Sequence, residues 1–418
     1  MVDASNVTTE NPHRQVARHG AANVSLGGER MFRPWTRRRG VAVGCLAVVA
    51  AWAPSAAQAS AATLYVSPGG SDSAACTSTH PCKTIGHAVA VAAAGDRIVV
   101  RRGTYAEMVT IGKTLHLVGR HRPTIDATGQ QNGVVIAGAA ASGSSLRGFE
   151  VENATQEGVV AMQTSWVTIA GNLVAGNDQG MFSSSPTGEC APVGEIPGDC
   201  GEGIHLMTVA HSHVSRNAIT GNAGGILVTD EFGPTHANVI SWNHVWRNDF
   251  DCGITVPGHN PNAVSSTGVP QPSMAGVYGN WIVHNVVNRN GLKGEGAGIL
   301  FAGAGPGTGS YDNFVGWNTT NGNELAGITV HSHAPDTDVN GNRFVGNWAS
   351  HNNLGGDPDA SVTKSTDILV FSAGDPITGT VARGNHLSHA FFGIWTLNAH
   401  TSLAHNHFHD VVVHVHQS

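Results

Sequence analysis

Short apolar segments, most of them introduced by glycine, recur along the chain. In each segment a β-branched residue comes second, and apolar and polar residues then alternate. An alternation with a period of two is typical of a β-strand that buries one face. Because so short a repeat cannot bury its own apolar face, it must stack on its neighbours, and the chain is predicted to be a solenoid. The segments begin at Gly158, Gly203, Gly225, Gly253, Gly298, Gly327, Asp367 and Gly393.

The spacing of the segments indicates the kind of solenoid. Successive segments start 45, 22, 28, 45, 29, 40 and 26 residues apart. A repeat of 22 residues is too short for two helices and a turn, but it fits one rung of a parallel β-helix, and the longer intervals then carry loop insertions on the working face. A two-sheet sandwich is the alternative, although a sandwich gives no reason for the same short sequence segment to recur in register. The 54 glycines and the low share of charged residues, 12%, agree with an all-β solenoid.

The interior of each rung is predicted to hold apolar side chains and asparagines. Inward-facing amides at the same turn of successive rungs can bond one another, so eight recurring asparagines are interpreted as a structural ladder. The predicted apolar interior comprises Ile204, Leu206, Ile226, Val228, Ile254, Val256, Ile299, Phe301, Ile328, Val330, Ile368 and Val370. The predicted ladder comprises Asn172, Asn217, Asn243, Asn285, Asn318, Asn347, Asn385 and Asn406.

The first part of the chain has the features of an export signal. Residues 1–30 form a polar extension without an apolar period, and we interpret them as an over-long start. Residues 31–59 combine three consecutive arginines, the apolar run 41–53 and a small-residue cleavage site at Ala57-Gln58-Ala59. The apolar run is too short to span a membrane. A secreted, extracellular protein beginning near Ser60 is therefore expected.

Cysteine spacing agrees with export. Cys76 and Cys82 lie in one Gly/Ser/Pro-rich loop, and Cys190 and Cys200 lie in another. Each pair can close a short loop as a disulfide in an oxidising compartment. Cys252 has no partner in this scheme and is interpreted as a buried, inert thiol.

The segment that follows the signal resembles a known family. It contains Leu64-Tyr-Val-Ser-Pro-Gly-Gly-Ser-Asp72, Pro81-Cys-Lys-Thr-Ile85, an Ala-rich helix to about Ala94, and Gly103-Thr-Tyr-Ala-Glu107. This stretch resembles the opening of secreted right-handed parallel β-helix proteins, the pectate-lyase-like superfamily. The resemblance implies an N-terminal cap and first coil over residues 60–110, with a capping helix, and a right-handed parallel β-helix over 111–418. It does not imply one reaction, since the superfamily includes lyases, hydrolases, epimerases, fructotransferases and non-catalytic adhesins.

Polar residues just after the repeat strands are predicted to share one edge of the solenoid. Asp230 and Glu231 follow one strand, His259 follows the next, and His331 and His333 end a later one. Adjacent rungs are about 4.8 Å apart, so these side chains are expected to line a groove for a sugar chain with carboxylate and imidazole catalysts. The alternative is a set of solvated turn residues.

Two further carboxylates are candidates for the same edge. Asp251 and Glu202 each precede a repeat strand, and His205 is expected to point outward beside Glu202. Asp230 or Glu231 against Asp251 would supply the pair of carboxylates that glycosidases use. An ordinary surface position is the alternative for His205.

An aromatic column precedes the recurring asparagines. Trp242, His284 and Trp317 occupy it. Exposed aromatic faces stack on sugar rings, so these residues are predicted to bind substrate, unless inserted loops cover them.

The 24 histidines raise the question of a metal. His331-Ser-His333 and His405-Asn-His407-Phe-His409 would each place imidazoles on one face of a strand, where they can hold zinc or copper. No metal ligand is assigned from the sequence, and no cofactor is certain. Ca²⁺ is considered because Asp and Asn lie in turns, but no calcium-loop motif is present.

Two classes of function follow from these observations. The first is an enzyme that cleaves the glycosidic bonds of a polysaccharide, as a hydrolase or a lyase. The second is a non-catalytic solenoid, either a cell-surface carbohydrate binder or a periplasmic metal-handling protein. The net charge of −7 and the lack of a basic run after the signal disfavour nucleic acid and anionic membranes as partners. We expect a monomer.

Overall fold

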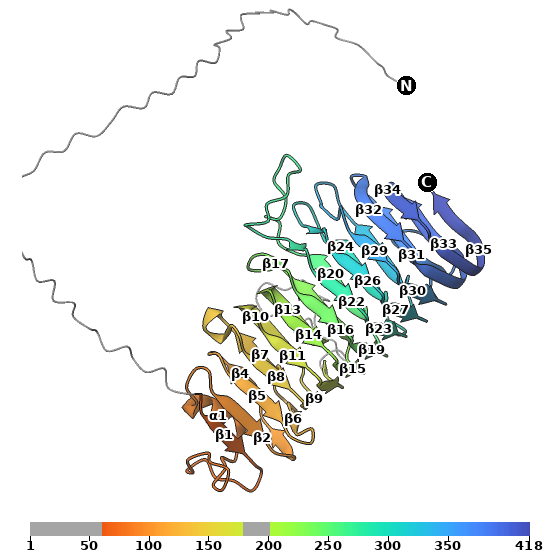
Figure 1. The fold of residues 1–418 in the computed structure, drawn as a ribbon. Helices are drawn as coiled ribbons and strands as arrows, with labels where there is room; N and C mark the ends of the chain where they lie inside the picture. Colours follow the sequence, from red (N-terminus) through yellow and green to blue (C-terminus); the bar gives the residue numbers. More distant parts are fainter. Residues whose placement is uncertain (1–60, 179–200) are drawn as a thin grey trace, which may run out of the picture. The chain divides into compact units, whose positions relative to one another are not determined.

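In a computed structural model that describes residues 61–178 and 201–418, the chain forms a stack of β-rungs (Figure 1). Each rung adds one short parallel strand to each of three faces. This arrangement confirms the predicted right-handed parallel β-helix, the hand that crossovers between parallel strands adopt. The polar extension 1–30, the predicted signal 31–59, and Cys190 and Cys200 lie outside the described residues.

The first face is a 12-stranded parallel sheet. Its strands, in spatial order, are β1 (Thr63–Val66), β2 (Arg97–Val100), β5 (His116–Gly119), β8 (Ser145–Arg147), β11 (Thr168–Ala170), β14 (His213–Ser215), β18 (Val239–Ser241), β22 (Trp281–Val283), β26 (Phe314–Gly316), β29 (Arg343–Val345), β32 (Ile377–Arg383) and β34 (Ala399–Ala404).

The second face consists mostly of three-residue strands. They are β3 (Thr104–Ala106), β6 (Thr124–Asp126), β9 (Glu150–Glu152), β12 (Leu173–Ala175), β15 (Ala218–Thr220), β19 (His244–Trp246), β23 (Val286–Asn288), β27 (Thr319–Asn321) and β30 (Trp348–Ser350), and the long strands β33 (His386–Leu397) and β35 (His407–Gln417) complete the face.

The third face carries the recurring glycine segments. Its strands are β4 (Val109–Ile111), β7 (Val134–Ala137), β10 (Val159–Ser165), β13 (Glu202–Ala210), β16 (Gly224–Thr229), β20 (Ile254–Gly258), β24 (Ile299–Gly303), β28 (Ile328–Ser332) and β31 (Thr366–Ser372). β33 and β35 continue onto this face. Three short strands, β17 (Thr235–His236), β21 (Val277–Tyr278) and β25 (Ser310–Tyr311), pair beside it.

The register along the third face keeps the second residue of every segment in one column. The paired positions are Val159, Ile204, Ile226, Ile254, Ile299, Ile328, Ile368 and Ile394. All eight side chains are fully buried. The intervals of different length therefore differ in their loops and not in the register of their strands, as predicted.

The asparagine ladder runs through all eight predicted residues. Each side-chain Nδ2 donates to the Oδ1 of the next asparagine at 3.0 Å, from Asn172 to Asn406. Two further ladders exist that the sequence analysis did not assign. One joins Asn177, Asn222, Asn248, Asn290, Asn323 and Asn352, and the other joins Asn238, Asn280, Asn313 and Asn342.

The ladder that begins at Asn177 explains why the segments begin with glycine. A Cβ atom on Gly203 would lie 2.8 Å from Nδ2 of Asn222 and 2.5 Å from a methyl group of Ile219. A Cβ on Gly253 would lie 2.7 Å from Nδ2 of Asn290. Only glycine leaves room for the amide at this turn.

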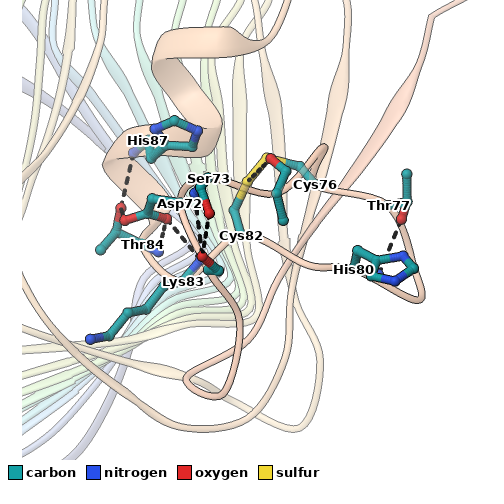
Figure 2. Close-up of a disulfide and its surroundings, with 11 residues drawn as sticks. Asp72, Ser73, Cys76, Thr77, His80, Cys82, Lys83, Thr84 and His87 are labelled. Atoms are coloured by element: carbon teal, nitrogen blue, oxygen red, sulfur yellow. Dashed lines mark hydrogen bonds between the residues drawn. A yellow bond between two sulfur atoms is a disulfide. The ribbon is translucent and has the colours of Figure 1, made fainter.

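The N-terminal region contains one α-helix, α1 (Ile85–Val91), among the described residues. The side chain of Thr84 accepts a hydrogen bond from His87 N at its N-terminus, and Asp72 accepts from the N–H of Thr84 (Figure 2). Cys76 and Cys82 form the predicted disulfide beside it (Figure 2). The helix adds apolar side chains to the common core, while its role as a cap remains a prediction. Within residues 61–178 and 201–418, no helix is long and apolar enough to span a membrane.

Candidate metal centre and the edge of the third face

The predicted edge exists, at the C-terminal ends of the third-face strands. Asp230 directly follows β16 and His259 follows β20, while His331 lies in β28. The register aligns Gly258 with Gly303 and then with Ser332, so these residues belong to neighbouring rungs. They separate into two groups, one around His259 and one around His331, with β24 between them.

Asp230 fixes a turn and does not face solvent. Its side chain is fully buried and accepts hydrogen bonds from the backbone N–H groups of His259, Asn260 and Gly276, at 2.7, 3.1 and 2.6 Å. Burial raises the pKa of Asp230 to about 6, and the three N–H donors oppose that rise. The expected position of this carboxylate in an open groove is therefore wrong, because both its oxygens are used to hold the turn.

Glu231 and His259 lie close together, as predicted from the sequence, but both side chains are buried. Oε1 of Glu231 lies 2.8 Å from Nδ1 of His259, and both side chains are only 3% exposed. Burial alone would raise the pKa of Glu231, but the hydrogen bond from His259 and nearby histidine charge hold it below its usual value. Thr229 also bonds to this carboxylate. The pair is thus a protected acid–imidazole contact.

His205 extends this row and is not a surface residue. Its Nε2 lies 2.8 Å from the hydroxyl of Thr229, and its Nδ1 lies 3.3 Å from Oε1 of Glu157. The imidazole is fully buried, and a carboxylate oxygen of the equally buried Glu202 lies within 4.8 Å of it. His205 alternates with the buried Ile204 and Leu206 on the strand, as predicted, but its imidazole is buried against Glu157 and Thr229.

Asp251 does not join the predicted carboxylate pair. The pairing of Ile226 with Ile254 places Asp251 opposite Ala223, at the start of the strand, while Asp230 lies at its end. Seven strand residues of about 3.3 Å each separate the two positions, which is far beyond the spacing of glycosidase carboxylates. The expected proximity of Asp230 or Glu231 to Asp251 is therefore wrong.

The aromatic column is present, and its rings stack on one another. Trp242 stacks on His284 with centroids 4.4 Å apart, and His284 stacks on Trp317 at 5.2 Å. Trp242 and Trp317 remain 57% and 48% exposed. His284 is stacked on both faces, while Trp242 and Trp317 each use one face to contact it. Sugar stacking needs a free face, so binding of substrate by this column remains a prediction.

The second group brings His331 and His333 together with a carboxylate that the sequence analysis missed. Nδ1 of His331 lies 3.4 Å from Nε2 of His333, and Oδ2 of Asp359 lies 3.6 and 3.2 Å from these two atoms. Three ligand atoms of the kinds that bind transition metals thus face one another. On its other side, Nε2 of His331 lies 3.0 Å from Oδ2 of Asp357.

A loop between β30 and β31 supplies both aspartates. Asp357 pairs with Val362 across a β-bridge, and its Oδ1 accepts the N–H of Ala360 at 3.0 Å. Ala360 and Val362 pack against the outward side chains of β31 and β33. Hydrogen bonding and apolar packing thus hold the loop over the strand that carries His331.

Exposure and charge differ between the two sides of this group. His331 and Asp357 are buried, with side chains 3% and 0% exposed, whereas His333 and Asp359 are 40% and 50% exposed. Burial alone would lower the pKa of His331, but contacts with Asp357 and Asp359 raise it to about 9. The contact with His331 lowers the pKa of Asp359. The group therefore has a fixed inner half and an outer half that is open to solvent.

Other clusters of ligand-type residues occur among the described residues. Glu157, Glu202 and His205 form the buried one noted above, while His389, His409 and Asp410 lie exposed near the C-terminal end. Cys76 and Cys82 lie near His87, but they are joined to each other. Cys252 is free and buried, as predicted, and burial raises the pKa of its thiol.

The sequence matches one family model, described as periplasmic copper-binding protein (NosD), over residues 89–288. That match covers slightly less than half of the chain and ends before His331. A search of curated proteins gave no match.

Solved structures with a similar fold were found. The Dettilon tailspike protein is 16% identical, with a TM-score of 0.53, over 83% of this chain and 61% of that one. An alginate lyase from Paenibacillus sp. is 14% identical, with a TM-score of 0.48, over 85% and 99% of the chains. The pectate lyase Pel9A is 14% identical, with a TM-score of 0.41, over 82% and 76%. At these identities the likeness concerns the fold alone, and the chain is a parallel β-helix protein.

Proposed function

We propose that this protein is an exported β-helix protein that binds a transition-metal ion, Cu²⁺ or Zn²⁺, through His331, His333 and Asp359. The observation that carries the proposal is the convergence of three ligand atoms within 3.6 Å of one another. Metal–ligand bonds of about 2.0–2.1 Å in a tetrahedral site require ligand atoms about 3.3 Å apart, so little movement is needed to admit an ion.

The donor set favours these metals. Two imidazole nitrogens and one carboxylate oxygen suit copper and zinc better than Ca²⁺, which prefers six to eight oxygen ligands. Among divalent first-row ions, Cu²⁺ is generally bound most tightly by such donors. The copper-binding description of the matching family supports the same choice.

The residues around the ligands suit a metal site. Asp357 contacts the nitrogen of His331 that points away from the other two ligands. A carboxylate in that place orients a ligating imidazole and makes it more basic. Because His333 and Asp359 are partly exposed, a bound ion would keep a position open to water or an incoming ligand. Such openness suits a protein that takes up and passes on a metal.

The test uses the mature protein after treatment with a chelator. Copper binding is measured by calorimetry, and Cu²⁺ coordination by electron paramagnetic resonance. We expect the unchanged protein to bind one equivalent of Cu²⁺ whose spectrum shows nitrogen hyperfine structure. We expect His333→Gln and Asp359→Asn each to lose this equivalent. Both side chains are partly exposed, so these variants should fold.

Matched controls lie on the same molecule. His400→Gln and Asp336→Asn change exposed residues outside the cluster and should keep the full stoichiometry. If His333→Gln and Asp359→Asn bind as many equivalents as the unchanged protein, with the same affinity, the proposal is wrong. Zn²⁺ is tested in parallel, and tighter binding of zinc would select that metal.

Cleavage of a polysaccharide is the second candidate, and the contact between Glu231 and His259 favours it. A hydrolase would release new reducing ends, and a lyase would also produce unsaturated uronate ends that absorb in the ultraviolet. Loss of either activity in Glu231→Gln, with the fold intact by circular dichroism, would support this function. The burial of both side chains counts against it.

A further inference from the structure

A basic groove lies on the outer side of the first three strands of the first face. It has a volume of about 730 Å³ and is lined by residues of β1, β2 and the turn after β5. This size is typical of pockets for small ligands. The groove takes no part in the proposed metal site, which lies on much later rungs.

The register shows how the groove is built. Tyr65 pairs with Val99 in the middle of the adjoining strands, and these two side chains form an apolar floor. Arg97 lies at one end of the same sheet surface, and Arg101 and Arg120 lie at the other. Arg102 and His121 complete the lining. An aromatic floor is thus bordered by guanidinium groups.

Among the described residues, the lining of this groove contains arginines and a histidine and no carboxylate. None of its four arginines forms an ion pair with a carboxylate in the part of the chain that the structure describes. Arg101 donates to the carbonyl of Ser78 and lies 6.0 Å from the centre of the Tyr65 ring. In a chain of net charge −7, such a concentration is unusual. Three of the four arginines lie in the short stretch 97–102, and the winding of the next rung adds Arg120.

A second hollow continues the basic surface. It has a volume of about 380 Å³, shares Arg102 and His121 with the groove, and adds Arg122 and Glu150. The two hollows meet where the first face turns into the second. A chain-like ligand could therefore contact both.

We propose that this groove binds an acidic oligosaccharide through its uronate carboxylates. Arginine forms paired hydrogen bonds to carboxylates, and an aromatic floor accepts the apolar face of a sugar ring. A lipid surface is disfavoured because the basic residues line a hollow. Duplex nucleic acid is disfavoured because the charge is confined to the first rungs.

The experiment measures binding of oligogalacturonate to the mature protein by calorimetry, with uncharged maltotetraose as the reference sugar. We expect oligogalacturonate to bind and its affinity to fall as salt is added, because exposed charges are screened. The double variant Arg97→Gln/Arg120→Gln should weaken binding at least tenfold. Tyr65→Leu should weaken it severalfold and keep the salt dependence.

The control is Arg343→Gln, an exposed arginine on the same face outside the groove, which should leave the affinity unchanged. Equal binding of maltotetraose, or no effect of the double variant, would overturn the proposal. Tighter binding of an oligothymidylate or of phosphatidylglycerol vesicles would also overturn it and assign the groove to that partner. Because the metal test uses other residues, either proposal can fail alone.

Discussion

At the scale of single residues, Asp367 is the clearest exception to the repeat. It stands where other rungs have glycine and ends one asparagine ladder, with Oδ1 3.2 Å from Nδ2 of Asn352. Its Oδ2 accepts the N–H of Ser388 at 3.0 Å. Burial raises the pKa of Asp367 to about 7, although these two hydrogen bonds oppose the rise. The folded protein therefore holds a proton that the unfolded chain releases near pH 3.8.

This shift predicts a pH-dependent stability. A carboxyl group with a raised pKa in the folded state stabilises the fold least above that pKa, so its contribution is lost as the pH rises from about 4 to about 7. Asp367→Asn removes the titration. We expect the free energy of unfolding of the variant, relative to the unchanged protein, to increase by as much as about 4 kcal/mol between acid and mildly alkaline pH.

Urea denaturation at several pH values measures this difference. Asp336→Asn, at an exposed carboxyl, is the control and should show no such trend. A difference between Asp367→Asn and the unchanged protein that is constant with pH would contradict the prediction.

At the scale of elements, the asparagine ladders join one rung to the next. Asn285 accepts from both the backbone N–H and the side chain of Asn243, and it donates to Asn318 and to the carbonyl of Ile240. Asn406 ends the same ladder and is half-buried. The hydrogen bonds of a central member are therefore all within protein.

Replacing a central member should cost more than replacing the last one. Asn285→Leu leaves buried donors and acceptors unpaired, and each unpaired group destabilises the fold by about 1–3 kcal/mol. We therefore expect the free energy of unfolding to fall by about 3 kcal/mol or more. Asn406→Leu should lower the free energy of unfolding by less than half of that, because Asn406 is half-buried and donates to the carbonyl of Ala382, whereas Asn285 donates to two buried acceptors. Thermal or urea unfolding of the two variants makes the comparison, and equal losses would show that the ladder position is unimportant.

At the scale of the whole solenoid, the two proposed sites occupy different rungs. The basic groove lies on β1, β2 and β5, and the metal group lies on β28 and the loop before β31. Each rung contacts only its neighbours, so the energetics of distant rungs should be additive. We expect saturation with Cu²⁺ to leave the affinity for oligogalacturonate unchanged. Calorimetric titration with and without the metal checks this, and a severalfold change would reveal coupling through the stack.

Much of this fold could be predicted because the repeat is local and regular. Gly203-Ile204 and its counterparts mark the strands, and Asn217 and its counterparts mark one turn of each rung. The other ladders share the spacing of five residues, as Asn238, Asn243 and Asn248 show, so the signal for them was present. The candidate site was harder, because Asp357 and Asp359 reach His331 through a loop with no repeat.

The sequence by itself determined the stack of rungs, the register of the third face, the long ladder and the edge that carries Glu231, His259 and His331. These features follow from periodic burial, which each rung repeats. Only the tertiary structure decided which edge residues meet solvent, because inserted loops cover the sheet where alternation alone predicts exposure. It also gathered the arginines of β2, of the turn after β2 and of the turn after β5 beside Tyr65 of β1, since winding brings residues of successive rungs together.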